Sequence, residues 1–205
     1  MNKEIVATIR SGIFAGICIG IAGLGYLAEK SIVGAVLFAF GLLTVVGYRL
    51  KLYTGTAGFI RKNEVGTLLL ILVSNVVGCF VLSMIARCLP TPAVQETAQG
   101  ILEARLKTGP LCGGVLAVGC GVIMTTAVNF ARKGNYYPLL FGVPLFITCG
   151  FPHCVADAFY YLTVPFSFWA ENWGEILIFY FSIVVGNFLG CNLYRLLVGE
   201  KADNE

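Results

Sequence analysis

Two ionisable residues lie inside an otherwise apolar stretch of this sequence, and they are the first candidates for a functional site. His153 is the single histidine of the chain, and Asp157 follows it by four residues. On a helix, that spacing places both side chains on one face. Ionisable groups in apolar, membrane-like surroundings are costly and usually mark a transport pathway or a proton relay. The alternative is a structural hydrogen bond between helices, and adding Cys154 gives only a thin set of metal ligands.

A second unusual stretch, residues 49–59, mixes cations, hydroxyls and glycines directly after an apolar block. Gly55 and Gly58 would weaken a helix, and hydroxyls such as that of Thr54 could satisfy the backbone groups that a break frees. Irregular backbone at membrane depth persists only where protein or a water-filled cavity covers it. The stretch is therefore either a helix break near Thr54 and Gly55 or an ordinary cytoplasmic loop.

The composition indicates which elements must position these groups. Apolar and aromatic residues make up 58% of the chain, charged residues only 12%, and the mean hydropathy is +0.84. A soluble domain carries about 25% charged residues, so an all-α, multi-pass membrane protein is predicted, and the net charge of +3 does not indicate nucleic-acid binding. A spanning helix needs about 20 mostly apolar residues. We expect one transmembrane domain over residues 1–205, with six spans at Ser11–Ala28, Ser31–Tyr48, Gly66–Ala86, Pro110–Phe130, Tyr136–Val164 and Ile176–Leu197.

The fifth of these blocks is longer than one crossing needs. Gly150 and Pro152 lie near its middle, and proline removes a backbone donor and kinks a helix. A discontinuous helix is therefore predicted in span five.

The distribution of cations predicts the orientation, because lysines and arginines gather in cytoplasmic loops. With the N-terminus placed in the cytoplasm, ten cations fall inside and four outside. The chain is therefore predicted to lie in a cell membrane with both termini in the cytoplasm. The inside set is Lys3, Arg10, Arg49, Lys51, Arg61, Lys62, Arg132, Lys133, Arg195 and Lys201, and the outside set is Lys30, Arg87, Arg105 and Lys107.

Spans three and six share a short pattern that begins with an asparagine. Asn75 opens Asn-Val-Val-Gly-Cys, and Asn187 opens Asn-Phe-Leu-Gly-Cys. Two halves of three spans each must be inverted relative to each other, and inverted repeats often build a transport path around a midplane site. The pattern predicts such a 3+3 repeat, unless the two short matches arose by chance.

Several motifs of this sequence resemble those of the formate/nitrite transporter family. They are Leu52-Tyr53-Thr54-Gly55 at the end of span two, Gly150-Phe151-Pro152-His153-Cys154-Val155-Ala156-Asp157 in span five, and the asparagine-glycine stretches Ser74–Gly78 and Gly186–Gly190 in spans three and six. A lysine usually precedes the family's fourth span, and Lys107 stands at that place. The resemblance covers essentially the whole chain.

The resemblance implies an aquaporin-like, six-span protomer with broken helices two and five, five copies of which form a ring. Each protomer would hold its own pore, with His153 and Thr54 between two apolar constrictions and with Lys51 and Lys107 at the two mouths. The residues that would line the constrictions are Phe38, Leu42 and Phe146.

The sequence also departs from the family pattern. Pro152 replaces the glutamate that precedes the family's histidine, and Asp157 replaces an asparagine. The asparagine expected in span four is absent, and Val118 and Gly119 stand near its place. These departures concern the substrate more than the fold.

The function expected from the resemblance is a channel or transporter for small monovalent weak-acid anions such as formate, nitrite, hydrosulfide, acetate and lactate. A bare charge is costly in an apolar constriction, whereas a neutral acid passes more easily. His153 would donate a hydrogen bond or a proton to the anion, and Thr54 would hold its oxygen or sulfur. An Asp157 carboxylate beside the imidazole would favour imidazolium; if it points away, its role is structural.

Two other classes stay open at this point. An intramembrane enzyme built on His153, Asp157 and Cys154 would need a facing polar cluster that the other spans do not offer, and a non-conducting structural subunit would need no pore. We expect a transporter rather than an enzyme, with no cofactor and no metal. Its partners would be the anion, protons, the bilayer and further copies of the chain.

Overall fold

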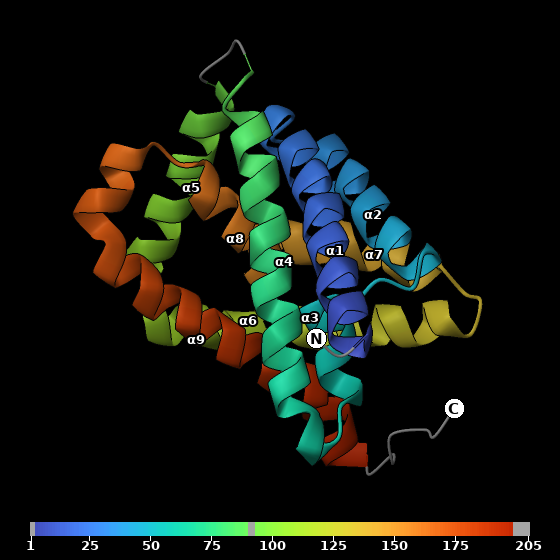
Figure 1. Ribbon diagram of the computed structural model, residues 1–205. Helices are drawn as coiled ribbons and strands as arrows, with labels where there is room; N and C mark the ends of the chain where they lie inside the picture. The colour runs from blue at the N-terminus through green and yellow to red at the C-terminus, as the bar shows by residue number, and fades with distance from the viewer. Residues whose placement is uncertain (1–2, 90–92, 199–205) are drawn as a thin grey trace.

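The computed structural model describes residues 3–89 and 93–198, and within these ranges all regular elements are helices (Figure 1). Four helices are long and apolar enough to cross a membrane by length and composition. They are α1 (Lys3–Ala28), α4 (Val65–Ala86), α6 (Pro110–Arg132) and α9 (Phe166–Val198). Two shorter apolar helices are α2 (Ile32–Gly47) and α7 (Tyr137–Thr148). The remaining elements are α3 (Tyr53–Thr56), α5 (Ala93–Thr108), α8 (Cys154–Thr163) and 3-10 turns at Ala57–Phe59 and Lys62–Glu64.

Large apolar side chains cover the outside of this bundle as well as its interior. Each of the four long helices exposes several of them, for example Ile21 on α1, Val73 on α4, Val115 on α6 and Phe181 on α9. The outer surface therefore suits lipid or a neighbouring protomer, and this explains why the chain is so apolar despite its modest size.

The helices differ from the expected spans in three places. α1 begins at Lys3 rather than at Ser11, and α9 begins at Phe166, ahead of the block that opens at Ile176. α5 occupies the link before the fourth span, where no helix was expected. Hydropathy overlooks α5 because the helix is amphipathic: it buries Val94, Ala98 and Leu102, four residues apart, between polar residues.

The first turn of α1 and the last turn of α9 both lie in the lower half of Figure 1. The placement of both termini in the cytoplasm stays a prediction, since no membrane is present. Lys201, one of the cations used for that prediction, lies outside the described residues.

Glycines allow the long helices to approach each other closely. A Cβ at Gly78 of α4 would overlap the carbonyl oxygen of Ile13 in α1, and a Cβ at Gly190 of α9 would overlap that of Val118 in α6. Small residues are the usual means of bringing membrane helices together. The pairs α1–α4 and α6–α9 thus form two tight supports, and the broken helices lie against them.

Candidate functional site

Both helix breaks end their first half with the same backbone hydrogen bond. After α2, the amide of Leu50 donates to the carbonyl of Val45 at 2.8 Å, and after α7, the amide of Phe151 donates to that of Phe146 at 2.9 Å. This is the closure of a Schellman motif, in which the chain leaves a helix through one residue of left-handed conformation. The chain is therefore turned out of the helix in a defined direction at both places.

The residues of positive φ mark the positions of the breaks. Gly150 takes φ 68° after α7, as a glycine readily does, but the equivalent residue after α2 is Arg49, with φ 53°. Gly55 lies inside α3 with ordinary space around its Cα. The break in span two therefore lies at residues 48–52, before the position expected near Thr54 and Gly55. Pro152 lies in the non-helical stretch 151–153 between α7 and α8.

Asn75 of α4 holds the start of α3. Its Oδ1 accepts from the amide of Tyr53 at 2.9 Å, and its Nδ2 donates to the carbonyls of Lys51 and Gly12, each at 2.9 Å. The first amide of a helix has no partner within the helix. The asparagine therefore satisfies that amide and ties the break to α1.

Asn187 of α9 holds the start of α8 in the same way. Its Oδ1 accepts from the amide of Cys154 at 2.8 Å, and its Nδ2 donates to the carbonyls of Pro152 at 3.0 Å and Ala117 at 2.8 Å. The three partners correspond one by one to those of the asparagine in α4. The two short helices are thus fixed by matching clamps.

The two breaks meet at His153 and Thr54. Thr54 Oγ1 lies 2.9 Å from Nε2 of His153, and both side chains are buried. His153 is the N-cap of α8, and its Nδ1 accepts from the amide of Ala156 at 3.1 Å. An imidazole nitrogen that accepts a hydrogen bond carries no proton. The proton of the neutral ring is therefore on Nε2, which donates to the threonine oxygen.

Asp157 faces away from the imidazole ring. One carboxylate oxygen accepts from the backbone amide of His153 at 2.8 Å, and the other from Nε of Arg105 at 3.0 Å. A further guanidinium nitrogen of Arg105 donates to the carbonyl of Gly150. Of the two roles considered for Asp157, this geometry favours the structural one: its negative charge is balanced by an arginine of α5, and it fixes the backbone of the break.

Apolar side chains enclose the histidine ring. The ring of Phe146 stacks on that of His153 with centroids 5.6 Å apart, and Phe38 meets Phe146 edge to face at 6.1 Å. Phe38 and Leu42 are completely buried, and Phe146 is nearly so. Phe38 and Phe146 thus lie close to the histidine, and Leu42 lines a second cavity.

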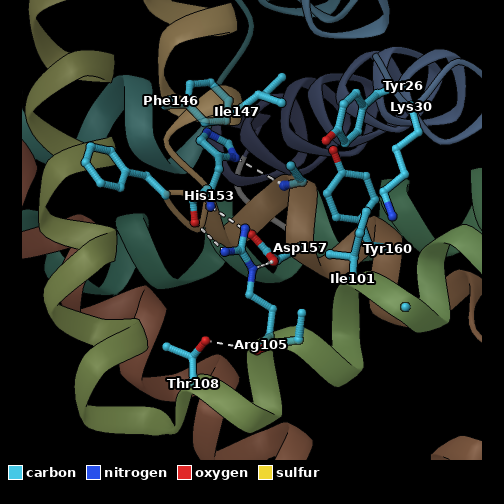
Figure 2. A pocket seen from close by; sticks show the side chains of 15 residues that line it. Tyr26, Lys30, Ile101, Arg105, Thr108, Phe146, Ile147, His153, Asp157 and Tyr160 are labelled. Atoms are coloured by element: carbon cyan, nitrogen blue, oxygen red, sulfur yellow. Dashed lines mark hydrogen bonds and ion pairs between the residues drawn. The ribbon is translucent and has the colours of Figure 1, made fainter. Parts of the chain in front are cut away.

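A cavity of about 250 Å³ opens on one side of His153. We call it the His153 cavity (Figure 2). Its polar wall combines two cations, one carboxylate and two phenols, which are Lys30, Arg105, Asp157, Tyr26 and Tyr160. Phe146 and Phe151 form part of the apolar lining of this cavity.

A larger cavity of about 750 Å³ lies beside the end of α2 and beside α3, and we call it the Lys51 cavity. Leu42 and Gly55 belong to its lining, together with the cations Arg49, Lys51 and Arg132. The ammonium of Lys51 donates to Thr8 Oγ1 at 2.9 Å. Lys51 therefore borders a cavity, as the resemblance implies for a mouth residue.

Lys107, the other residue expected at a mouth of the pore, does not border the His153 cavity. It is exposed on α5, whereas Arg105 of the same helix lines that cavity. Arg105 was not among the site residues predicted from the sequence. A signal was available, because a buried acid such as Asp157 needs a cationic partner, and four cations had been assigned to that side. Among the described residues, no group of three histidine, cysteine or acidic side chains could hold a metal ion.

Comparison with known proteins decides the family. The family model of the formate/nitrite transporters matches residues 1–198. The chain belongs to the formate/nitrite transporter family. This is a family of transporters, not of enzymes, and no curated protein matches the sequence.

Solved structures of the family share the fold. A structure titled "Pentameric formate channel with formate bound" is similar with a TM-score of 0.81 and 21% identity, over 96% of this chain and 96% of that one. A structure titled "FNT family ion channel" is similar with a TM-score of 0.68 and 18% identity, over 93% of this chain and 86% of that one. At these identities the likeness establishes the fold, and what passes through this chain has to be argued from its own residues.

Proposed function

We propose that this chain conducts small monovalent weak-acid anions, of the formate, nitrite and hydrosulfide class, across a cell membrane. The observation that carries the proposal is the 2.9 Å contact between His153 and Thr54, a buried polar pair at the junction of two helix breaks. One cavity borders His153, the other borders Gly55 next to Thr54, and cations line both. Membership of a transporter family supports the same conclusion.

The proposed architecture has six spans, in which α2 with α3 and α7 with α8 each make one interrupted crossing. Matching contacts support an inverted repeat of three spans. Besides the two asparagine clamps, the thiol of Cys79 donates to the carbonyl of Val155 at 3.3 Å, and that of Cys191 donates to the carbonyl of Thr54 at 3.4 Å. Each half therefore contacts the short helix of the other half in the same manner. A ring of five such protomers is proposed from the likeness to a pentameric channel.

The proposed pathway runs from one cavity to the other past the pair of polar side chains. Phe38, Leu42 and Phe146 exclude water around it, so an anion that enters without hydrogen bonds meets a large desolvation cost. Nε2–H of His153 is the donor best placed to replace water, and the hydroxyl of Thr54 adds a second polar contact. A small anion that displaces the threonine from Nε2 would keep one strong hydrogen bond at the narrowest point.

The tautomer bears on how a proton takes part. Protonation of Nδ1 would break its bond with the amide of Ala156, and a neutral imidazole that lost its Nε2 proton would become an imidazolate. Neither change is favourable in a buried site. In our proposal His153 therefore acts as a hydrogen-bond donor, and a proton that accompanies the anion comes from water in the cavities.

The test is anion flux in proteoliposomes with a formate, nitrite, hydrosulfide, acetate and lactate panel, at varied pH on each side. His153→Asn is suited to it, because asparagine is a good N-cap and can keep the bond to the amide of Ala156 while losing the reach to Thr54. Thr54→Val removes only the hydroxyl. Thr163→Val is the matched control, since that buried hydroxyl donates to the carbonyl of Phe159 within its own helix and lines neither cavity.

We expect flux to fall about tenfold or more in His153→Asn, which removes a hydrogen bond to the charged anion of about 1.5–3 kcal/mol. Flux should fall severalfold in Thr54→Val, which removes a hydrogen bond of about 0.5–1.5 kcal/mol, and should be unchanged in Thr163→Val. Wild-type flux of these anions in the folded His153→Asn variant would refute the proposed role of the histidine.

A further inference from the structure

The charges around the His153 cavity have a simple balance. Lys30 and Arg105 each contribute one positive charge, Asp157 contributes one negative charge, and the other lining residues are uncharged. The cavity therefore carries one net positive charge. The Lys51 cavity differs, since its lining holds Arg49, Lys51, Arg132 and only one acid.

Asp157 lowers the net charge of the His153 cavity, but neither of its carboxylate oxygens is left without a hydrogen bond to face an incoming anion. Both carboxylate oxygens of Asp157 already accept hydrogen bonds, from Arg105 and from the backbone of His153. Its side chain is completely buried, whereas that of Arg105 is 18% exposed. The carboxylate thus acts on the cavity through its charge, while the guanidinium presents its remaining N–H groups.

Hydrogen-bond donors dominate the rest of the polar wall. Tyr26 and Tyr160 line the cavity with their rings 6.2 Å apart, and Figure 2 shows them on the same side of it as Lys30. Together with Arg105, they provide phenol, ammonium and guanidinium donors. This is the chemistry that binds a carboxylate or a similar small oxyanion.

We propose that the His153 cavity is a docking site for one small monoanion and that Asp157 limits the valence of the bound anion, because cancelling one of the two cationic charges halves the electrostatic advantage of a dianion over a monoanion. The inference rests on the proposed function, because it describes how anions are selected before they reach the constriction. It concerns binding in the cavity, however, and can be measured without transport.

The charge of Asp157 should affect dianions and monoanions by different factors, so the ratio of their affinities reports on it. If loss of the carboxylate charge raises the affinity of a monoanion by some factor, it raises that of a dianion by the square of the factor, because the interaction energy scales with the charge of the ligand. With an effective dielectric constant of about 60 and a separation of about 7 Å, the factors are about fourfold and about sixteenfold. Removing the charge of Lys30 should act in the opposite direction by similar factors.

The experiment compares acetate with malonate at pH 7.5 and at an ionic strength of about 0.15 M, where distant surface charges are screened. Two readouts are used: the shift in thermal stability of detergent-solubilised protein with ligand concentration, and the inhibition of acetate flux by malonate in proteoliposomes. The variants are Asp157→Asn, Lys30→Gln and the double variant, which restores one net positive charge. Glu103→Gln is the matched control, since it removes an acid of α5 that is exposed and outside the cavity.

We expect the ratio of malonate to acetate affinity to rise about fourfold in Asp157→Asn, to fall about fourfold in Lys30→Gln, and to return near the wild-type value in the double variant and in Glu103→Gln. A ratio that stays at the wild-type value in Asp157→Asn and Lys30→Gln would overturn the inference, as would the absence of any ligand-induced shift in all variants. If no variant conducts acetate but the thermal shifts follow this order, the proposed function fails and the docking site stands.

Discussion

The clamp made by Asn187 offers the sharpest test of how this fold holds its helix breaks. Replacing Asn187 by leucine keeps a side chain of similar size and removes three hydrogen bonds at once. The amide of Cys154 and the carbonyls of Pro152 and Ala117 would lose a partner. All three lie at the junction of α6, α8 and α9.

The magnitude follows from the cost of leaving a buried polar group unpaired, which is about 1–3 kcal/mol for each group. Part of that cost is recovered as neighbours adjust, so we expect a loss of about 3–6 kcal/mol in the free energy of unfolding for the three groups. For a chain of this size, each kcal/mol corresponds to about 2–4 °C in the melting temperature. The apparent melting temperature in detergent should therefore fall by roughly 6–24 °C.

The assay is thermal unfolding of the purified protein, followed by fluorescence, with the variant Asn172→Leu as control. Asn172 donates to the carbonyl of Phe168 one turn earlier in its own helix, and that side chain is only partly buried. Its loss should cost less than about 0.5 kcal/mol. Asn75→Leu should behave like Asn187→Leu, because it loses the same three kinds of contact. If Asn187→Leu melts within about 2 °C of the control, the asparagine does not hold the break, and our account of the breaks is refuted.

Three further expectations concern single positions. Gly150→Ala should lower the free energy of unfolding by about 1–2 kcal/mol, a purely conformational cost, because φ is positive there and nothing lies within 4 Å of the added Cβ; an unchanged denaturation midpoint would contradict this. Gly190→Ala should lower the free energy of unfolding by at least about 1–3 kcal/mol, since the new Cβ overlaps a carbonyl oxygen of α6. Gly25→Ala has open space around it and should be neutral or stabilising by less than about 1 kcal/mol. Equal melting temperatures for the two variants would be inconsistent with close packing at Gly190. Lys51→Gln should reduce anion flux severalfold at low salt, and the difference from wild type should shrink as added salt screens the lysine charge; a salt-independent defect would indicate a structural role for its bond to Thr8 instead.

Much of the site was accessible from the sequence. The apolar blocks indicate a membrane protein because a long run without charges has few other stable environments. Glycine and proline within one such block place a break before His153, and the structure has it at residues 149–153. These properties are local, since they depend on residues that are neighbours along the chain.

Local pattern was less reliable in span two. The glycines after Thr54 left open a break near Thr54 or an ordinary loop, but the turn is made by Arg49, and Gly55 lies in a short helix. A composition rich in glycine shows where a chain can bend, whereas hydrogen bonds from elsewhere decide where it does. In this case Asn75 accepts a hydrogen bond from the amide of Tyr53, so the helix restarts at that residue.

The partners of the ionisable residues were decided by tertiary structure alone. His153 and Thr54 are 99 positions apart and Arg105 and Asp157 are 52 positions apart, yet each pair is in hydrogen-bond contact. From the sequence, Asp157 could have faced the imidazole or turned away from it, and Lys107 could have stood at the mouth of the pore as well as Arg105. Helix propensity and hydropathy do not distinguish these cases. The outcome depends on which face of α5 packs against the break. The sequence by itself thus determined that an ionisable group lies at a helix break inside a membrane protein, and the packing of distant helices decided which charge balances it and which tautomer the histidine adopts.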